Sequence, residues 1–143
     1  MDYKSIPFDK RIKDNVKNYA LDNLYHIDTL TEYCKALCAV ADVEILLTER
    51  HGEKVVSVGN FAGFIPDVVN EPGRKVRVYG RTIAHLYAKT QNVTPESKEA
   101  VERLLDGLTQ ILSHWGEEAY LHTESSIYMD ELEEKVGVQH VQT

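Results

Sequence analysis

The chain has 143 residues, of which 43% are apolar and 27% charged, and its formal net charge is −7. A chain of this size and composition forms one globular domain with its own core, and its acidity argues against nucleic acid or anionic membrane as a partner. No apolar run approaches the ~20 residues of a membrane helix, and residues 1–15 lack the apolar stretch of a secretory signal. We therefore expect a cytoplasmic protein.

Two helices are predicted at the start of the chain. Apolar residues at helical spacing predict the first over residues 9–25. Thr29-Leu30-Thr31-Glu32 matches a capping box and predicts the start of a second, largely buried helix. Cys34 and Cys38 would lie on one face of that helix. Because two cysteines alone fit neither a zinc site nor a disulfide framework, we interpret them as core residues.

Two β-hairpins are predicted next. In the first, Val43, Ile45 and Leu47 alternate with other residues, and His51-Gly52 supplies the turn before a second strand. The second hairpin lies within KVRVYGRTIAHLYAK, where Gly-Arg at its centre fits a two-residue turn with glycine first. In that register one face of the sheet would hold Val76, Val78, Ile83, His85 and Tyr87.

Residues 95–137 predict one long helix. Thr94-Pro95-Glu96 is typical of a helix start, and the apolar positions resume beyond Gly116. A helix of this length spans about 64 Å, whereas a compact body of this size is about 40 Å across. The distal part should therefore extend beyond the body, and we predict a hinge at Gly116. Segment 117–137 holds seven acids and one lysine, so it carries most of the acidity of the chain.

An isolated helix of ~20 residues is marginally stable in water, so the overhang needs a partner. A second copy of the chain provides one by symmetry, and the seven-residue spacing from Leu121 to Tyr128 suits a short coiled-coil seam. The predicted dimerisation residues are Trp115, Leu121, Tyr128, Leu132 and Val136. The alternatives are a helix that bends back over the body and a frayed chain end.

The order of these elements predicts an α+β fold, with an antiparallel sheet flanked by N-terminal helices and a long C-terminal helix. We divide the chain into an N-terminal helix (1–27), a globular domain (28–115), a protruding signalling and dimerisation helix (116–137) and a disordered tail (138–143).

On these features the chain resembles GAF-like sensor domains. The matching parts are the opening helix, the first hairpin ADVEILLTERHGEKVVSVG, the late hairpin GRTIAHLYAK and the closing helix, together about residues 28–137. The tail AYLHTESSIYMDELEEKV is similar to the helix that joins such sensors to diguanylate cyclase (GGDEF) domains in some bacterial proteins. The resemblance implies a GAF-like sheet with a ligand pocket beside the final strand pair, and an output domain in cis. The chain itself has no GGDEF motif.

The candidate ligand-pocket residues are Phe61, Phe64, Arg77, Tyr79, His85 and Tyr87. His85 could donate a hydrogen bond or ligate a haem or metal, the phenylalanines could form an aromatic lid, and Arg77 belongs to a small basic cluster suited to an anion. Each also has a structural interpretation: a satisfied core histidine, an anchor for the loop, and solvated strand ends. No metal site is predicted, and no cofactor or ligand is identified.

The sequence contains no glycine-rich phosphate loop, nucleophile elbow, HExxH or spaced CxxC pair. We therefore predict a non-enzymatic regulatory domain that dimerises through its terminal helix and passes a ligand or partner signal to an output domain. The alternative is a pure assembly domain without a ligand. A thiol-dependent methionine sulfoxide reductase of the GAF type is less favoured, because a buried helix face disfavours a thiolate.

Overall fold

The structure, a computed structural model, describes residues 5–142, with the side chains of residues 8–135. In chain order the elements are α1 (Ser5–Asp14), the 3-10 helix η1 (Asn15–Asn18), α2 (Leu21–Leu24), α3 (Ile27–Ala41), β1 (Glu44–Glu49), β2 (Lys54–Val58), β3 (Arg74–Val78), β4 (Arg81–Lys89) and α4 (Lys98–Gln142). The predicted α+β class, with an antiparallel sheet and a long C-terminal helix, is confirmed.

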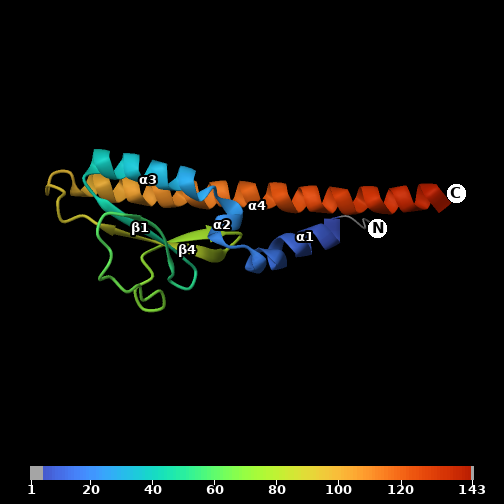
Figure 1. Ribbon diagram of the computed structural model, residues 1–143, viewed down its shortest axis with the longest axis horizontal. Helices are drawn as coiled ribbons and strands as arrows, with labels where there is room; N and C mark the ends of the chain where they lie inside the picture. Colours follow the sequence, from blue (N-terminus) through green and yellow to red (C-terminus); the bar gives the residue numbers. More distant parts are fainter. Residues whose placement is uncertain (1–4, 143) are drawn as a thin grey trace.

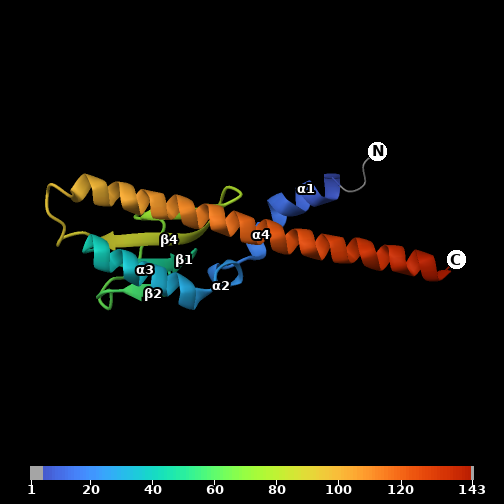
Figure 2. The ribbon, with the colours of Figure 1, turned by 90° about the horizontal axis from the view of Figure 1, so that it is seen from above.

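The four strands form one sheet in the order β2-β1-β4-β3, and every neighbouring pair is antiparallel. The helices α3 and α4 run side by side over one face of this sheet (Figures 1 and 2). The loop between β2 and β3, residues 59–73, lies on the opposite side (Figure 1). The sheet is therefore the middle layer between a helical layer and a loop.

Strand β1 shows how both faces are covered. Ile45 and Leu47 point into the hydrophobic core beneath the helices, whereas Leu46, which is paired with Tyr87 of β4, and Thr48 point toward the loop. All four residues are fully buried. A strand buried on both faces needs cover on each side, so the loop is a structural layer of the domain.

The single helix predicted for residues 9–25 is wrong. The chain forms α1, η1 and α2 in succession, because Tyr19 and Ala20 are in an extended conformation that no helix can continue through. This break turns the Tyr19 side chain toward α4, where its hydroxyl group is hydrogen-bonded.

Two predicted helix starts are also displaced. Helix α3 begins at Ile27, before the predicted capping box, because the ring nitrogen Nδ1 of His26 accepts a hydrogen bond from the backbone N–H of Thr29. Helix α4 begins at Lys98, since residues 94–97 form a turn.

The predicted register of the second hairpin is wrong as well. Its two turn residues are Tyr79 and Gly80, both with positive φ (49° and 79°), which is the requirement of a type I′ turn. The ladder pairs Val78 with Arg81, and it shifts by one residue beyond Val76. As a result Val76 and Val78 face the core beneath α4, on the opposite side of the sheet from His85 and Tyr87.

Helix α4 is continuous over 45 residues, or about 67 Å at 1.5 Å per residue. Its first part lies along the sheet and α3, and its remainder extends beyond the body, with α1 beside its middle (Figures 1 and 2). The helix runs without a break through Gly116 and through most of the segment predicted as a disordered tail, while residue 143 lies outside the described residues.

Candidate functional site

Three of the predicted pocket residues form an aromatic cluster between the loop and the sheet. The ring centroids of Phe61 and Phe64 are 6.1 Å apart, those of Phe64 and Tyr87 are 5.2 Å apart, and both pairs meet edge to face. Phe61 is buried, and the ammonium group of Lys89 lies 4.7 Å from the centre of its ring. These rings pack against one another and hold the loop on the sheet.

The polar groups on this face bind the same loop. The ring nitrogen Nδ1 of His85 donates a 2.8 Å hydrogen bond to the carbonyl oxygen of Pro72. The Tyr87 hydroxyl donates another of 2.8 Å to the carbonyl oxygen of Glu71. His85 is only 4% exposed, so its contacts secure the end of the loop.

The other two predicted pocket residues, Arg77 and Tyr79, lie away from this cluster. Arg77 is exposed on the edge strand β3, and its backbone N–H donates a hydrogen bond to the Ser113 hydroxyl of α4. Tyr79 is at the hairpin turn, where its ring centroid lies 5.7 Å from that of Tyr120. The six candidates therefore divide between the loop face and the contact with α4.

The basic cluster predicted near β3 is partly neutralised by α4. Arg74 forms ion pairs with Glu102 and with Asp106, the latter at 2.8 Å. Burial alone lowers the pKa of Arg74, but the hydrogen bonds and charges of these two carboxylates outweigh it and raise the pKa. Arg74 therefore secures β3 to the helix.

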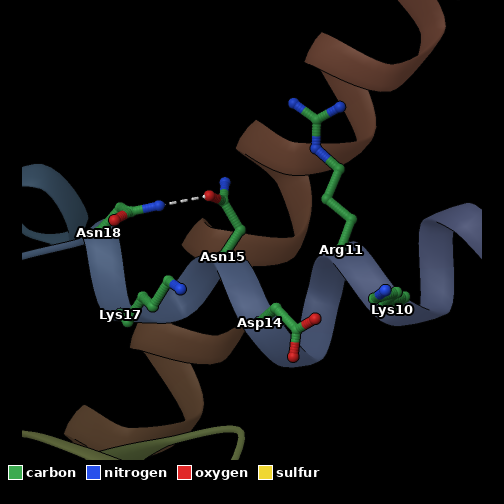
Figure 3. Close-up of a pocket in the computed structure, with 6 residues that line it drawn as sticks. All are labelled: Lys10, Arg11, Asp14, Asn15, Lys17 and Asn18. Atoms are coloured by element: carbon green, nitrogen blue, oxygen red, sulfur yellow. Dashed lines mark hydrogen bonds between the residues drawn. The ribbon is translucent and has the colours of Figure 1, made fainter.

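A polar junction joins the N-terminal segment to α4, and sequence reasoning did not find it. The carboxylate of Glu124, which is fully buried, accepts hydrogen bonds from Nε of Arg11 (2.5 Å), Nδ2 of Asn15 (2.5 Å) and the hydroxyl of Tyr19 (2.6 Å). Figure 3 shows Arg11 and Asn15 extending from the N-terminal segment toward α4. We call these four residues the Glu124 junction.

Further contacts extend the junction along α4. Nη1 of Arg11 donates hydrogen bonds to both carboxylate oxygens of Glu131, at 3.0 and 3.1 Å. The hydroxyl of the buried Tyr120 donates to the carbonyl oxygen of Ile12 at 2.7 Å, and the ring of Phe8 lies 5.0 Å from that of Tyr128. The acidic helix is therefore covered in part by residues 8–19 of its own chain.

The electrostatics of the junction favour a charged Glu124. Burial by itself raises the pKa of this carboxyl group, but the hydrogen bonds from Tyr19, Arg11 and Asn15 and the charge of Arg11 outweigh it and lower the pKa. The ionised form of Tyr120 is disfavoured, because burial and the charge of Glu124 raise its pKa to about 12. Glu124 is thus a satisfied buried anion.

A weak sequence signal for this junction existed. Arg11, Asn15 and Tyr19 are spaced at four-residue intervals, which places polar groups on one face of a helical segment. The apolar pattern of this segment predicted a different buried face. The partner of the polar face, Glu124, lies more than a hundred residues away in the chain. An open groove of about 580 Å³ runs beside the junction and is lined by Lys10, Arg11, Asp14, Asn15, Lys17 and Asn18 (Figure 3).

The predicted dimerisation residues are distributed over different faces of α4. Trp115 is 43% exposed, and its ring lies 5.9 Å from that of Tyr33 on α3. Leu121 is also exposed and Leu132 is half-buried, whereas Tyr128 contacts Phe8 of α1. The side chain of Val136 lies outside the described residues.

Large apolar side chains remain exposed on the helical layer. On α4 these include Leu104, Ile111, Trp115 and Met129, and on α3 they include Tyr33 and Val40. Within the part of the chain that the structure describes, no three His, Cys, Asp or Glu residues form a group that could hold a metal ion. None of the described helices is both long enough and apolar enough to cross a membrane.

No protein-family model, curated protein or solved structure matches this chain.

Proposed function

We propose that this chain is a non-enzymatic regulatory module that forms a homodimer through α4 and passes conformational change along that helix to an output domain. The observation that supports it is the continuity of α4. Its first part includes the core residues Leu105 and Leu112, and its last part extends beyond the body as the same helix. A change in the packing of the body would move the distal end of a continuous helix.

The proposed output domain is a diguanylate cyclase, and it rests on the similarity of residues 119–136 to helices that precede GGDEF domains. The GAF-like character of the body is part of the same proposal. The aromatic cluster on the loop face favours a partner protein over a small molecule as the input signal, because its rings pack against one another. That packing is also what a pure assembly domain would have, and this function is the second candidate.

The proposed dimer can be tested by sedimentation equilibrium of the 143-residue chain. Trp115→Glu places a charge on the exposed face of α4, whereas Ile65→Glu places the same charge at an exposed apolar residue of the loop, away from α4. We expect dimers for the wild type and Ile65→Glu, and a dissociation constant at least tenfold higher for Trp115→Glu. A wild-type chain that stays monomeric at high concentration would refute the proposed function.

A further inference from the structure

The exposed face of α4 carries a heptad pattern. Steps of four and three residues connect Leu104, Leu108, Ile111, Trp115, Glu118, His122, Ser125, Met129 and Leu132, and we call this row the α4 seam. Two apolar ends flank a polar centre formed by Glu118, His122 and Ser125. A row that repeats every 3.5 residues is typical of a helix that packs along a second helix.

One face of α4 is already occupied by the rest of the chain. Leu105, Leu112 and Gly116 are buried against the body, and Glu124 and Tyr128 contact the N-terminal segment. The seam remains exposed at Ile111 (47%) and Met129 (54%), one near each end. The side of α4 that is available to a partner therefore extends along both the body and the overhang.

We infer, resting on the proposed function, that a second copy of the chain covers the α4 seam in antiparallel orientation, with the two-fold axis midway between Glu118 and His122. In this register Glu118 lies opposite the partner's His122, and Trp115 lies opposite the partner's Ser125. Ile111 lies opposite the partner's Met129, and Leu108 lies opposite the partner's Leu132.

The side chains in these layers are complementary in size and in hydrogen-bonding capacity. The largest residue of the seam, Trp115, faces a serine, and the one acidic residue, Glu118, faces a histidine. A parallel dimer in register would instead place Glu118 against the partner's Glu118, and like charges that face each other at an interface are destabilising.

The distribution of charge along α4 favours the same orientation. Segment 117–137 has a net charge of −6, whereas residues 98–115 contain two basic and three acidic residues. A parallel dimer would bring two strongly acidic segments together over their whole length. The antiparallel dimer places each acidic segment over the nearly neutral first half of the other helix.

The dimensions of α4 also match. The part that lies along the body, residues 98–120, and the part beyond it, residues 121–142, are both roughly 34 Å long at 1.5 Å per residue. Each overhang can therefore cover the exposed face of the other body, including Leu104, Ile111 and the adjacent Tyr33 of α3. Regulation would then act between subunits, because the helix that leads to one output domain rests on the body of the other.

Disulfide cross-linking of cysteine variants tests the orientation. Cys34 and Cys38 are buried, so they can remain in place and the wild type serves as the control. In the antiparallel dimer, Ile111→Cys mixed with Met129→Cys forms a cross-linked heterodimer. Each variant alone does not, since its two copies lie about 27 Å apart along the axis, well beyond the reach of a disulfide.

A second variant uses the polar centre of the seam. His122→Lys places an ammonium group opposite the partner's Glu118, so we expect about fivefold tighter dimerisation at low salt. In a parallel dimer the same substitution would place the two introduced ammonium groups opposite each other, which weakens association. A monomeric wild type refutes the proposed function as a whole. A dimer in which either single variant cross-links with itself, or in which the mixture forms no cross-link, overturns only the antiparallel arrangement.

Discussion

Nε of Arg11 donates a 2.5 Å hydrogen bond to the carboxylate of Glu124, 113 positions later in the chain. The contact joins the N-terminal segment to the part of α4 that leaves the body. It also explains part of the acidity of segment 117–137, because Glu124 and Glu131 are both paired with Arg11. The overhang is thus held on one side by its own chain and exposed along the seam.

Arg11→Met should destabilise the protein by about 2–3 kcal/mol, because it leaves the buried charge of Glu124 without its ionic partner. Loss of one partner of a fully buried pair costs about 3–5 kcal/mol, and Arg11 is partly exposed. The matched control Glu131→Gln removes only the exposed ion pair between Arg11 and Glu131, and it should cost at most about 1 kcal/mol. Urea denaturation followed by circular dichroism measures both; equal effects would contradict a buried role for Glu124.

Stability should depend on pH through Glu124. Since its pKa in the folded state is lowered, its contribution is present above the pKa of the unfolded state, about 4.3 for glutamate. That contribution is lost as the pH falls through the lower, folded-state value. We expect the difference in unfolding free energy between wild type and Glu124→Gln to be constant from pH 7 to about 5 and to shrink toward pH 3. A difference that grows on acidification would reverse the assigned sign.

Gly116→Ala should be destabilising even though alanine favours a helix. A Cβ atom at Gly116 would lie 2.5 Å from the Tyr25 hydroxyl oxygen and 2.8 Å from Cγ2 of Val78. Overpacking of this kind costs about 1–3 kcal/mol, against a gain of about 1 kcal/mol in helix propensity. Gly107→Ala is the matched control, since nothing lies within 4 Å of its Cβ position. We expect thermal denaturation to show a lower Tm for the first variant and a higher Tm for the second.

Cys34 should resist alkylation in the native protein. Burial raises the pKa of its thiol to about 11, with a smaller contribution from Cys38, and the side chain is 1% exposed. Iodoacetamide labelling at pH 7.5, followed by mass spectrometry, should modify Cys34 only after addition of urea. Rapid labelling without urea would restore the thiol-dependent enzyme as a candidate function.

Local patterns in the sequence predicted much of the fold. Alternation in β1 and the His51-Gly52 turn placed the first hairpin, and helical periodicity predicted the length of α4. The predicted register of the second hairpin was wrong because Tyr79, a bulky residue, takes a positive φ that sequence patterns assign to glycine. The register of that strand pair, and with it the face that holds Val76, followed from this one residue.

The Glu124 junction could not be predicted in the same way. Nothing in the local sequence distinguishes Glu124 from the exposed acids around it, because its burial results from packing against residues more than a hundred positions away. Conversely, Phe61, Phe64 and Tyr87 were all among the candidate pocket residues, and the structure brings their rings together. Whether they bind a ligand or the loop depends on how tightly the rings pack, which sequence patterns do not record.

The Glu124 junction also has a consequence for biosynthesis. Translation proceeds at about 5–20 residues per second, so Arg11 has been synthesised roughly 6–23 s before Glu124. During that interval the sheet can form on the emerging polypeptide, while residues 8–19 have no acidic helix to dock on. A chain terminated early, before codon 124, would leave this amphipathic basic segment available to chaperones and proteases.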